Sequence, residues 1–409
     1  MMGMTRSTPG PNEGPNAAPV LDLEALPFVV RMLDGPDNPA GVPNTFAFRL
    51  HLDAASGHLY QPDDPALARL LDEAYRTGSL LGTAMDDTAS GNAYANDFLR
   101  FIRASAPSSA RCLEIGAGRG FLTRRLIDAG LAVDALEPGK ANEPHWQRHG
   151  VRVTADSFPS TKLTGQYDLI VAYAVLEHIA ELAPFFDAAR KQLTAEGRLI
   201  IAVPDCGPCL EAGDPSILLH EHYHYFTDQS LARCLELSGF RAAKIERAGH
   251  GGVLYCCAQA KDDITVSSPG DAELEMLRGF GPRMLRQRVR IAEKLAVARA
   301  AGTEIGIYCP NRAIALLTPG TEGVRFFDDD PDLYRKHYPT FAAAVENRAD
   351  LMARPVQELW ILSRSFGARI RDRLRQEPSL KQIDIKLAEQ ILDGAANDAG
   401  AAPGLRNGG

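Results

Sequence analysis

The stretch LEIGAGRGFLTRRL, from Leu113 to Leu126, decides the fold of this chain. It begins with apolar residues typical of a strand end, continues through three glycines at alternate positions, and ends in a run with helical spacing of its apolar residues. Glycine admits conformations and close approaches that other side chains prevent, so such a loop lets a ligand lie against the main chain. The stretch therefore predicts the start of an α/β domain.

The flanking sequence repeats this alternation of strand and helix. Strands are predicted in RCLEIG, AVDALE, VRVTAD, YDLIVAYA and GRLIIAVP, and FRAAKIERA and GVLYCCAQA predict a closing pair. Short apolar strands that alternate with helices indicate a parallel sheet covered on both faces. We expect an α/β fold of Rossmann-like type, with a mostly parallel seven-stranded sheet.

Changes in composition divide the 409 residues into six segments. Both ends are polar and rich in glycine, and the first is also rich in proline, so we expect them to be disordered. FAFRLHLDAASGHLYQ predicts a hairpin, and NRAIALL predicts a helix in a second, C-terminal Rossmann-like α/β unit. The predicted segments are a lead (1–20), a small N-terminal domain (21–95), the glycine-loop domain (96–262), a helical connector (263–300), a C-terminal α/β domain (301–395) and a tail (396–409).

The bulk composition limits the partners. The formal net charge is −8, which does not predict a nucleic-acid or anionic-membrane surface, and no apolar run is long enough to cross a bilayer. Seven irregularly spaced cysteines do not predict a disulfide framework and favour a reducing compartment. We expect a cytoplasmic monomer or homodimer that acts on a small molecule.

The glycine loop departs from the dinucleotide fingerprint G-x-G-x-x-G. Gly120 comes one position early, and Phe121 stands where that fingerprint needs a small residue. The pattern acidic-x-G-x-G-x-G resembles instead the first motif of class I S-adenosylmethionine-dependent methyltransferases. The resemblance implies that S-adenosyl-L-methionine is the cofactor and that Glu114 supplies negative charge near its ammonium and sulfonium groups. The other residues of this predicted contact are Gly116, Ala117, Gly118, Gly120 and Phe121.

Three further signals follow in the order that this family has them. Glu137 ends the next strand, where a carboxylate can accept both ribose hydroxyls. Asp156 ends the strand after that and is expected to accept a hydrogen bond from the adenine amino group. Tyr167–Ile179 resembles the family's fourth-strand motif. The remaining predicted cofactor residues are Pro138, Ser157, Phe158 and Tyr173.

After the fifth strand comes HEHYHYF, residues 220–226. It resembles the HEH-x-x-YF stretch of three-domain C-methyltransferases that act on nucleotide-linked keto-sugars. The resemblance implies that His222 is the general base for a proton beside a ketone and that Glu221 orients it. It also implies that His178 or Tyr225 stabilises the enolate.

The flanking domains depart from that family. Its members open with a zinc domain built on two C-x-x-C pairs, whereas Asp53 and Ser56 stand at the positions of the second pair and no cysteine precedes Cys112. We expect the scaffold to remain without its metal, because a structural zinc needs four good ligands. The family's last domain helps to hold the substrate nucleotide through a glycine-bearing loop. Here that loop is bulkier, although Arg312 and the helix start suit an anion.

The three alternating histidines His220, His222 and His224 would share one face of an extended segment. A metal site is one interpretation, and polar lining of a pocket is the other. Methyl transfer needs no metal, so we assign no metal ligands.

These observations favour a methyltransferase of the C-methylating, keto-sugar type that acts on a small acceptor, with a nucleotide-linked acceptor as one candidate. One alternative is an O- or N-methyltransferase of natural-product biosynthesis. Another, of a different class, is a non-catalytic protein that binds the cofactor and scaffolds its partners.

Overall fold

The computed structural model describes residues 18–28, 34–38, 42–76, 87–105, 110–317, 323–338, 340–364 and 366–393. The predicted tail and almost all of the predicted lead lie outside these ranges. The chain forms two compact units, which are described separately. The first comprises residues 1–25, 47–212 and 219–281, and the second comprises 26–46, 213–218 and 282–409.

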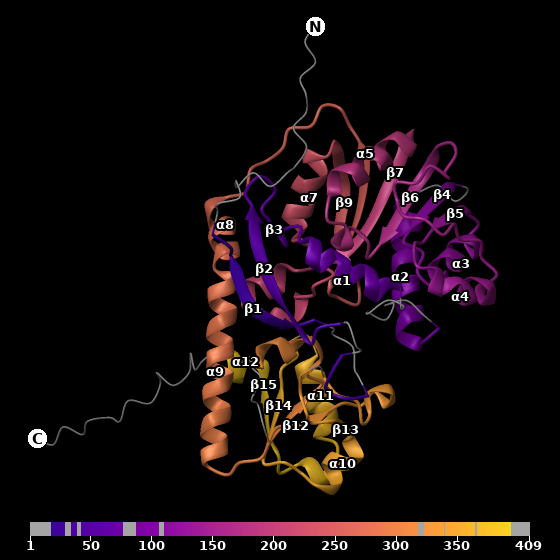
Figure 1. Cartoon of the computed structure of the whole chain (residues 1–409). Coiled ribbons are helices and arrows are strands. Elements are labelled where there is room, and N and C mark those ends of the chain that lie inside the picture. The colour runs from indigo at the N-terminus through magenta and orange to yellow at the C-terminus, as the bar shows by residue number, and fades with distance from the viewer. Residues whose placement is uncertain are drawn as a thin grey trace, which may run out of the picture. The chain divides into compact units, whose positions relative to one another are not determined.

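The first unit contains a six-stranded sheet with the strand order β5-β4-β6-β7-β10-β9 (Figure 1). Strands β5, β4, β6 and β7 are parallel, whereas β10 runs antiparallel to both β7 and β9. The strands are β4 Arg111–Ile115, β5 Ala132–Leu136, β6 Tyr167–Tyr173, β7 Leu193–Pro204, β9 Phe240–Arg247 and β10 Val253–Ala260. The predicted α/β class, mostly parallel sheet and closing pair are confirmed.

Alternating side chains of this sheet form two apolar layers. Leu113, Ile170 and Ile201 pack with helices α5 and α7, while their chain neighbours Cys112, Val171 and Ile200 pack with α2 and α3. Successive strand residues point to opposite faces, so both faces are covered. The helices of this unit are α1 Pro65–Arg76, α2 Ala89–Ser105, α3 Phe121–Asp128, α4 Glu143–His149, α5 Leu182–Gln192, α6 Gly207–Ala212, α7 Asp228–Leu237 and α8 Asp271–Arg278.

The prediction of seven strands is wrong by one. VRVTAD does not form a strand; it pairs with β5 through the single parallel bridge between Leu136 and Thr154. Two hydrogen bonds, Thr154 N to Ala135 O and Glu137 N to Thr154 O, hold this segment at the edge of the sheet. The segment still directs Asp156 toward the same end of the sheet as the strand ends.

A second sheet has the order β1-β2-β3-β8. Its strands are β1 Leu21–Pro27, β2 Thr45–Asp53, β3 His58–Tyr60 and β8 His224–Tyr225. The predicted hairpin is confirmed as the antiparallel pair of β2 and β3, joined by the turn at Asp53–Ser56. Strand β3 also pairs with β8, so an N-terminal hairpin takes the HEHYHYF segment as its next strand.

The second unit carries a parallel sheet with the order β13-β12-β11-β14-β15. Its elements are β11 Ile305–Tyr308, β12 Arg325–Phe327, β13 Val345–Glu346, β14 Glu358–Ile361, β15 Asp384–Leu387, α10 Arg348–Ala353, α11 Gly367–Leu374 and α12 Ala388–Leu392. The long helix α9, Phe280–Ala300, leads into it.

NRAIALL, where a helix was predicted, forms a 3₁₀ helix over Asn311–Leu316 rather than an α-helix. The segment follows Cys309, whose φ is +47°, and the chain is extended again at Leu317. Short 3₁₀ runs are usual in such connections between elements. Within the described ranges, no helix is long and apolar enough to cross a membrane.

Candidate active site

The glycine loop after β4 depends on backbone conformations that glycine tolerates. Gly116, Gly118 and Gly120 have φ values of +75°, +51° and +78°. A Cβ on Gly116 would lie 2.5 Å from a methyl carbon of Val175, so the loop after β4 fits closely against the segment after β6. Gly116 N and Ala117 N donate to Leu136 O, both at 2.9 Å, which fixes the loop to the end of β5.

Glu137 braces this loop from the end of β5. Its Oε2 accepts a hydrogen bond from Gly118 N at 2.9 Å and its Oε1 accepts one from Gly139 N at 2.8 Å. Each carboxylate oxygen has a second lone pair. The side chain is half-buried and is thus oriented before any ligand binds. The neighbouring Pro138 is exposed.

Glu114 is a buried carboxyl group directly before the loop, with 2% of its surface exposed. Burial and the nearby charge of Glu137 raise its pKa to about 7, and the neighbouring Thr123 hydroxyl opposes the shift. Its Oε2 accepts no hydrogen bond from the described residues. An anionic group placed this way gains most from a cationic ligand.

The raised pKa of Glu114 makes a prediction about stability. The folded chain holds this proton between pH 4.5 and about 7, while the unfolded chain, with the ordinary pKa of 4.5, has released it. The free energy of unfolding should therefore fall by about 3 kcal/mol over that interval as the pH rises.

The Glu114→Gln variant should lack this pH-dependent fall in the free energy of unfolding, because glutamine does not titrate. Urea unfolding of both proteins at several pH values measures it. A difference in unfolding free energy between the two proteins that stays constant from pH 5 to pH 8 would contradict the assignment.

The predicted adenine residues lie where the chain leaves the bridge at Thr154. Asp156 accepts hydrogen bonds from Ser157 N at 3.1 Å and Ser160 Oγ at 2.7 Å, and these bonds and Lys162 lower its pKa. The ring of Phe158 packs edge-on against Phe185, with the centroids 5.2 Å apart. Asp156 is thus held in its charged form beside an apolar ring.

Two other predicted cofactor residues are aromatic side chains near the loop. The Phe121 ring is buried at the start of α3 and lies under the Arg125 guanidinium, 5.1 Å from its centroid. Tyr173, at the end of β6, packs edge-on against Phe98 at 5.0 Å. Burial and the nearby charge of Glu177 raise the pKa of Tyr173, so its hydroxyl stays protonated.

The segment after β6 turns sharply. Ala174 has a φ of +52°, and Leu176–His178 forms a single 3₁₀ turn. Nδ1 of His178 lies 3.0 Å from Glu221 O. Because a carbonyl oxygen only accepts, Nδ1 carries the proton of this bond, and Nε2 holds the lone pair of the neutral ring.

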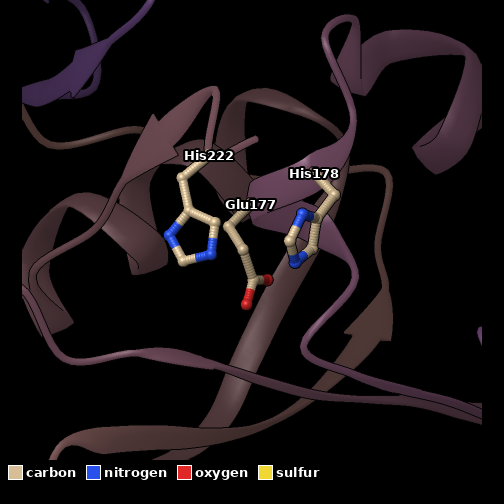
Figure 2. Close-up of side chains that lie close together, drawn as sticks. All are labelled: Glu177, His178 and His222. Carbon is tan, nitrogen blue, oxygen red and sulfur yellow. The ribbon is translucent and has the colours of Figure 1, made fainter. Parts of the chain in front are cut away.

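His222 faces this turn from the HEHYHYF segment. Its ring is perpendicular to the ring of His178, with the centroids 4.8 Å apart, and 5% of its surface is exposed. Figure 2 shows the Glu177 carboxyl group between the two imidazoles. One ligand atom from each of these three side chains lies within 4.8 Å of the other two.

Glu177 was not predicted as a site residue, although its neighbour His178 was. Only 1% of its surface is exposed. Its backbone oxygen accepts a hydrogen bond from Tyr223 N at 2.6 Å, so the same residue also ties the HEHYHYF segment to the turn after β6. The contact joins residues 46 positions apart, which no local pattern indicates.

The three alternating histidines have separate neighbours. Residues 220 and 221 form a turn rather than an extended strand, so the expected common face does not exist. His220 packs edge-on against Phe48, His222 against His178, and His224 near His58.

Tyr225 and Gln61 hold the backbone of the segment. The fully buried Tyr225 hydroxyl donates to Leu219 O at 3.1 Å. Gln61 Nε2 donates to the backbone oxygens of Leu219, His220 and His222 at 3.3, 3.0 and 2.7 Å. Gln61 N adds a bond to Tyr223 O at 2.8 Å. These bonds fix the loop that carries Glu221 and His222.

A buried chain of hydrogen bonds lies at the turn where Asp53 and Ser56 replace the second cysteine pair of the zinc domain. Asp53 Oδ1 accepts from Ala55 N, Ser56 Oγ pairs with His58 Nδ1 at 2.5 Å, and His58 Nε2 pairs with His224 Nδ1 at 3.1 Å. Burial lowers the pKa of His58 to about 4 and that of His224 to about 3. A neutral, hydrogen-bonded histidine pair therefore joins the hairpin to β8.

Comparisons with known proteins match part of this chain. Residues 89–245 match the model of a family described as Methyltransferase domain. The C-methyltransferase NovU of Streptomyces niveus is 27% identical over an alignment of 240 residues, which covers 53% of this chain; the chain spans 57% of the length of that relative.

Solved structures of low identity also match. The 1,6-didemethyltoxoflavin-N1-methyltransferase of Burkholderia thailandensis, with bound 1,6-didemethyltoxoflavin and S-adenosylhomocysteine, is 22% identical, with a TM-score of 0.36 and coverage of 52% of this chain and 99% of that one. The glycopeptide N-methyltransferase MtfA complexed with S-adenosyl-L-methionine is 16% identical, with a TM-score of 0.35 and coverage of 43% and 96%.

Proposed function

We propose that residues 89–245 form a class I methyltransferase domain and that the chain uses it to transfer a methyl group from S-adenosyl-L-methionine to a small-molecule acceptor. The main support for this proposal is the close fit of the Gly116 loop against Val175, which precedes Glu177 by two residues and His178 by three. The cofactor loop and the candidate proton-transfer groups thus meet at one end of the sheet, where open α/β sheets bind ligands.

The residues of the loop suit this cofactor. Glu114 Oε2 is buried without a hydrogen bond from the described residues, and a ligand ammonium or sulfonium would supply the missing opposite charge. Glu137 holds its carboxylate ready for two hydroxyl groups, and Asp156 with Phe158 offers an acceptor and an apolar ring for adenine.

We propose further that the nucleophile is a carbon atom beside a ketone, as in keto-sugar nucleotides. When bound, S-adenosyl-L-methionine supplies a strongly electrophilic methyl group. His222 removes the proton from the acceptor carbon, and the buried carboxyl groups around it stabilise the imidazolium. In this proposal Glu221 orients His222, and Glu177 lies between both rings. The C-methyltransferase relative supports carbon as the nucleophile.

His178 and Tyr225 take different parts in this proposal. Nδ1 of His178 donates to Glu221 O, so only the protonated ring can also donate to an enolate oxygen through Nε2. The Tyr225 hydroxyl is bonded to Leu219 O in the core and therefore acts as a positioning residue. Glu177 and His222 are buried and His178 is half-buried, which limits the access of water to the proton transfer.

Glu137→Ala should weaken the binding of S-adenosyl-L-methionine by about 1–3 kcal/mol, because it removes the acceptors for both ribose hydroxyls. Calorimetric titration measures this, with Glu143→Ala, an exposed carboxyl on α4, as the control. The wild-type chain should bind S-adenosyl-L-methionine or S-adenosylhomocysteine and should not bind NAD. Equal affinity of Glu137→Ala and wild type would remove Glu137 from the site.

A further inference from the structure

We propose that Glu177, His178 and His222 form a binding site for a divalent transition-metal ion such as Zn²⁺ or Co²⁺, and that occupation of this site blocks methyl transfer. Three donor atoms, one carboxylate oxygen and two imidazole nitrogens, lie within 4.8 Å of one another. This differs from the sequence-based assignment, in which no metal ligand was assigned and Glu177 was not considered.

The spacing of the donors is close to that of a loaded site. Zinc binds imidazole nitrogen and carboxylate oxygen at about 2.0–2.2 Å, so donors at tetrahedral positions are about 3.4 Å apart. Side-chain rotations can bring atoms that start within 4.8 Å to that distance. Figure 2 shows the Glu177 carboxyl group between the two rings, so no ligand has to cross another to reach a common ion.

The surroundings already provide the outer contacts of a metal site. Metal-ligating histidines usually donate their second ring N–H to a carbonyl or carboxylate, which fixes the tautomer. Nδ1 of His178 makes such a bond with Glu221 O at 3.0 Å, and this leaves Nε2 as the ligand. Tyr223 N to Glu177 O and His222 N to Leu219 O hold the backbones of two ligands, at 2.6 and 3.0 Å.

The donor set selects the class of ion. Two imidazoles and one carboxylate suit Zn²⁺, Co²⁺, Ni²⁺ or Fe²⁺, whereas Mg²⁺ and Ca²⁺ prefer oxygen ligands. Three protein ligands leave a coordination position for water or a substrate oxygen. The ion also compensates a carboxylate of which only 1% is exposed.

The effect on catalysis rests on the proposed function. A lone pair of His222 that binds an ion cannot accept a proton from the acceptor carbon. Saturation with Zn²⁺ should therefore stop methyl transfer, and a chelator should restore it. Metal binding does not depend on which acceptor the chain methylates. The binding site and the inhibition of methyl transfer can therefore be tested separately.

The test is a titration of the tag-free full chain with Co²⁺, followed by its visible absorption, and with Zn²⁺ in a calorimeter. We expect one ion per chain, with a d–d spectrum and no thiolate-to-cobalt charge-transfer band. Glu177→Gln and His222→Asn should each weaken binding at least about 10-fold. His337→Gln, a histidine of the second unit, is the matched control and should bind as the wild type does.

Melting temperatures of the two variants show whether each is folded, and either folded variant decides the question. Unchanged affinity in a folded Glu177→Gln or His222→Asn variant would overturn the site, as would a thiolate charge-transfer band. Binding as expected with turnover unchanged or increased by Zn²⁺ would overturn the inhibitory part alone. Absence of turnover in the presence of a chelator would count against the proposed function and leave the binding result intact.

Discussion

His222→Ala should lower kcat about 10²–10⁴-fold and leave the affinity for S-adenosyl-L-methionine unchanged, because a positioned general base contributes that much to proton transfer. His222 is buried against His178 in the segment after β7, whereas most of the predicted cofactor contacts lie on the loops after β4 and β5 and on the segment bridged at Thr154. Steady-state kinetics and calorimetry on the same preparation measure the two quantities.

The control for this variant is His337→Ala, which removes a histidine of the second unit. A side chain that only shapes the loop would behave differently when replaced. Its loss would lower the melting temperature and leave the kcat of the folded fraction near that of the wild type. That result would remove His222 from catalysis.

Gln61→Leu should lower kcat about 10²-fold, although Gln61 takes no part in the chemistry. One amide nitrogen holds the backbone oxygens of Leu219, His220 and His222, and leucine cannot donate to them. A displacement of about 1 Å in a catalytic group can cost about 10²-fold in rate. The unfolding free energy should also fall by about 1–3 kcal/mol, because buried carbonyls lose their donor.

The matched control is Gln166→Leu. Gln166 Nε2 donates to the backbone oxygen of Leu193 at 3.1 Å, at the start of β6 and far along the strand from the site. It should lose stability without a comparable loss of kcat. An equal loss of kcat in both variants would mean that general destabilisation, rather than the position of His222, explains the effect of Gln61.

The sequence predicted the features that local patterns determine. Alternating apolar residues and glycines at fixed positions produced β4, its loop and α3, and the antiparallel pair at the end of the sheet. The missing seventh strand shows the limit of this reasoning. VRVTAD has the composition of a strand, but its pairing with β5 stops at Thr154, and a sequence pattern does not show where pairing stops.

The parts of the site that were not predicted depend on contacts between distant residues. Gln61 lies 161 positions before His222, and its hydrogen bonds exist only because β3 pairs with β8. Glu177 lies near His222 because its backbone oxygen is bonded to Tyr223 N, in the same segment as His222. The prediction that His220, His222 and His224 share one face also failed. Alternate residues share a face only in an extended chain, and His220 and Glu221 form a turn.

The atom that receives the methyl group shows whether the chain is a C-methyltransferase. The chain is incubated with a nucleotide-linked keto-sugar and a donor whose methyl group carries deuterium and ¹³C, and the product is examined by carbon NMR. If His222 removes a proton from the carbon beside the ketone, we expect a labelled methyl group bonded to that carbon, and no such product from His222→Ala. A label on oxygen or nitrogen would contradict it.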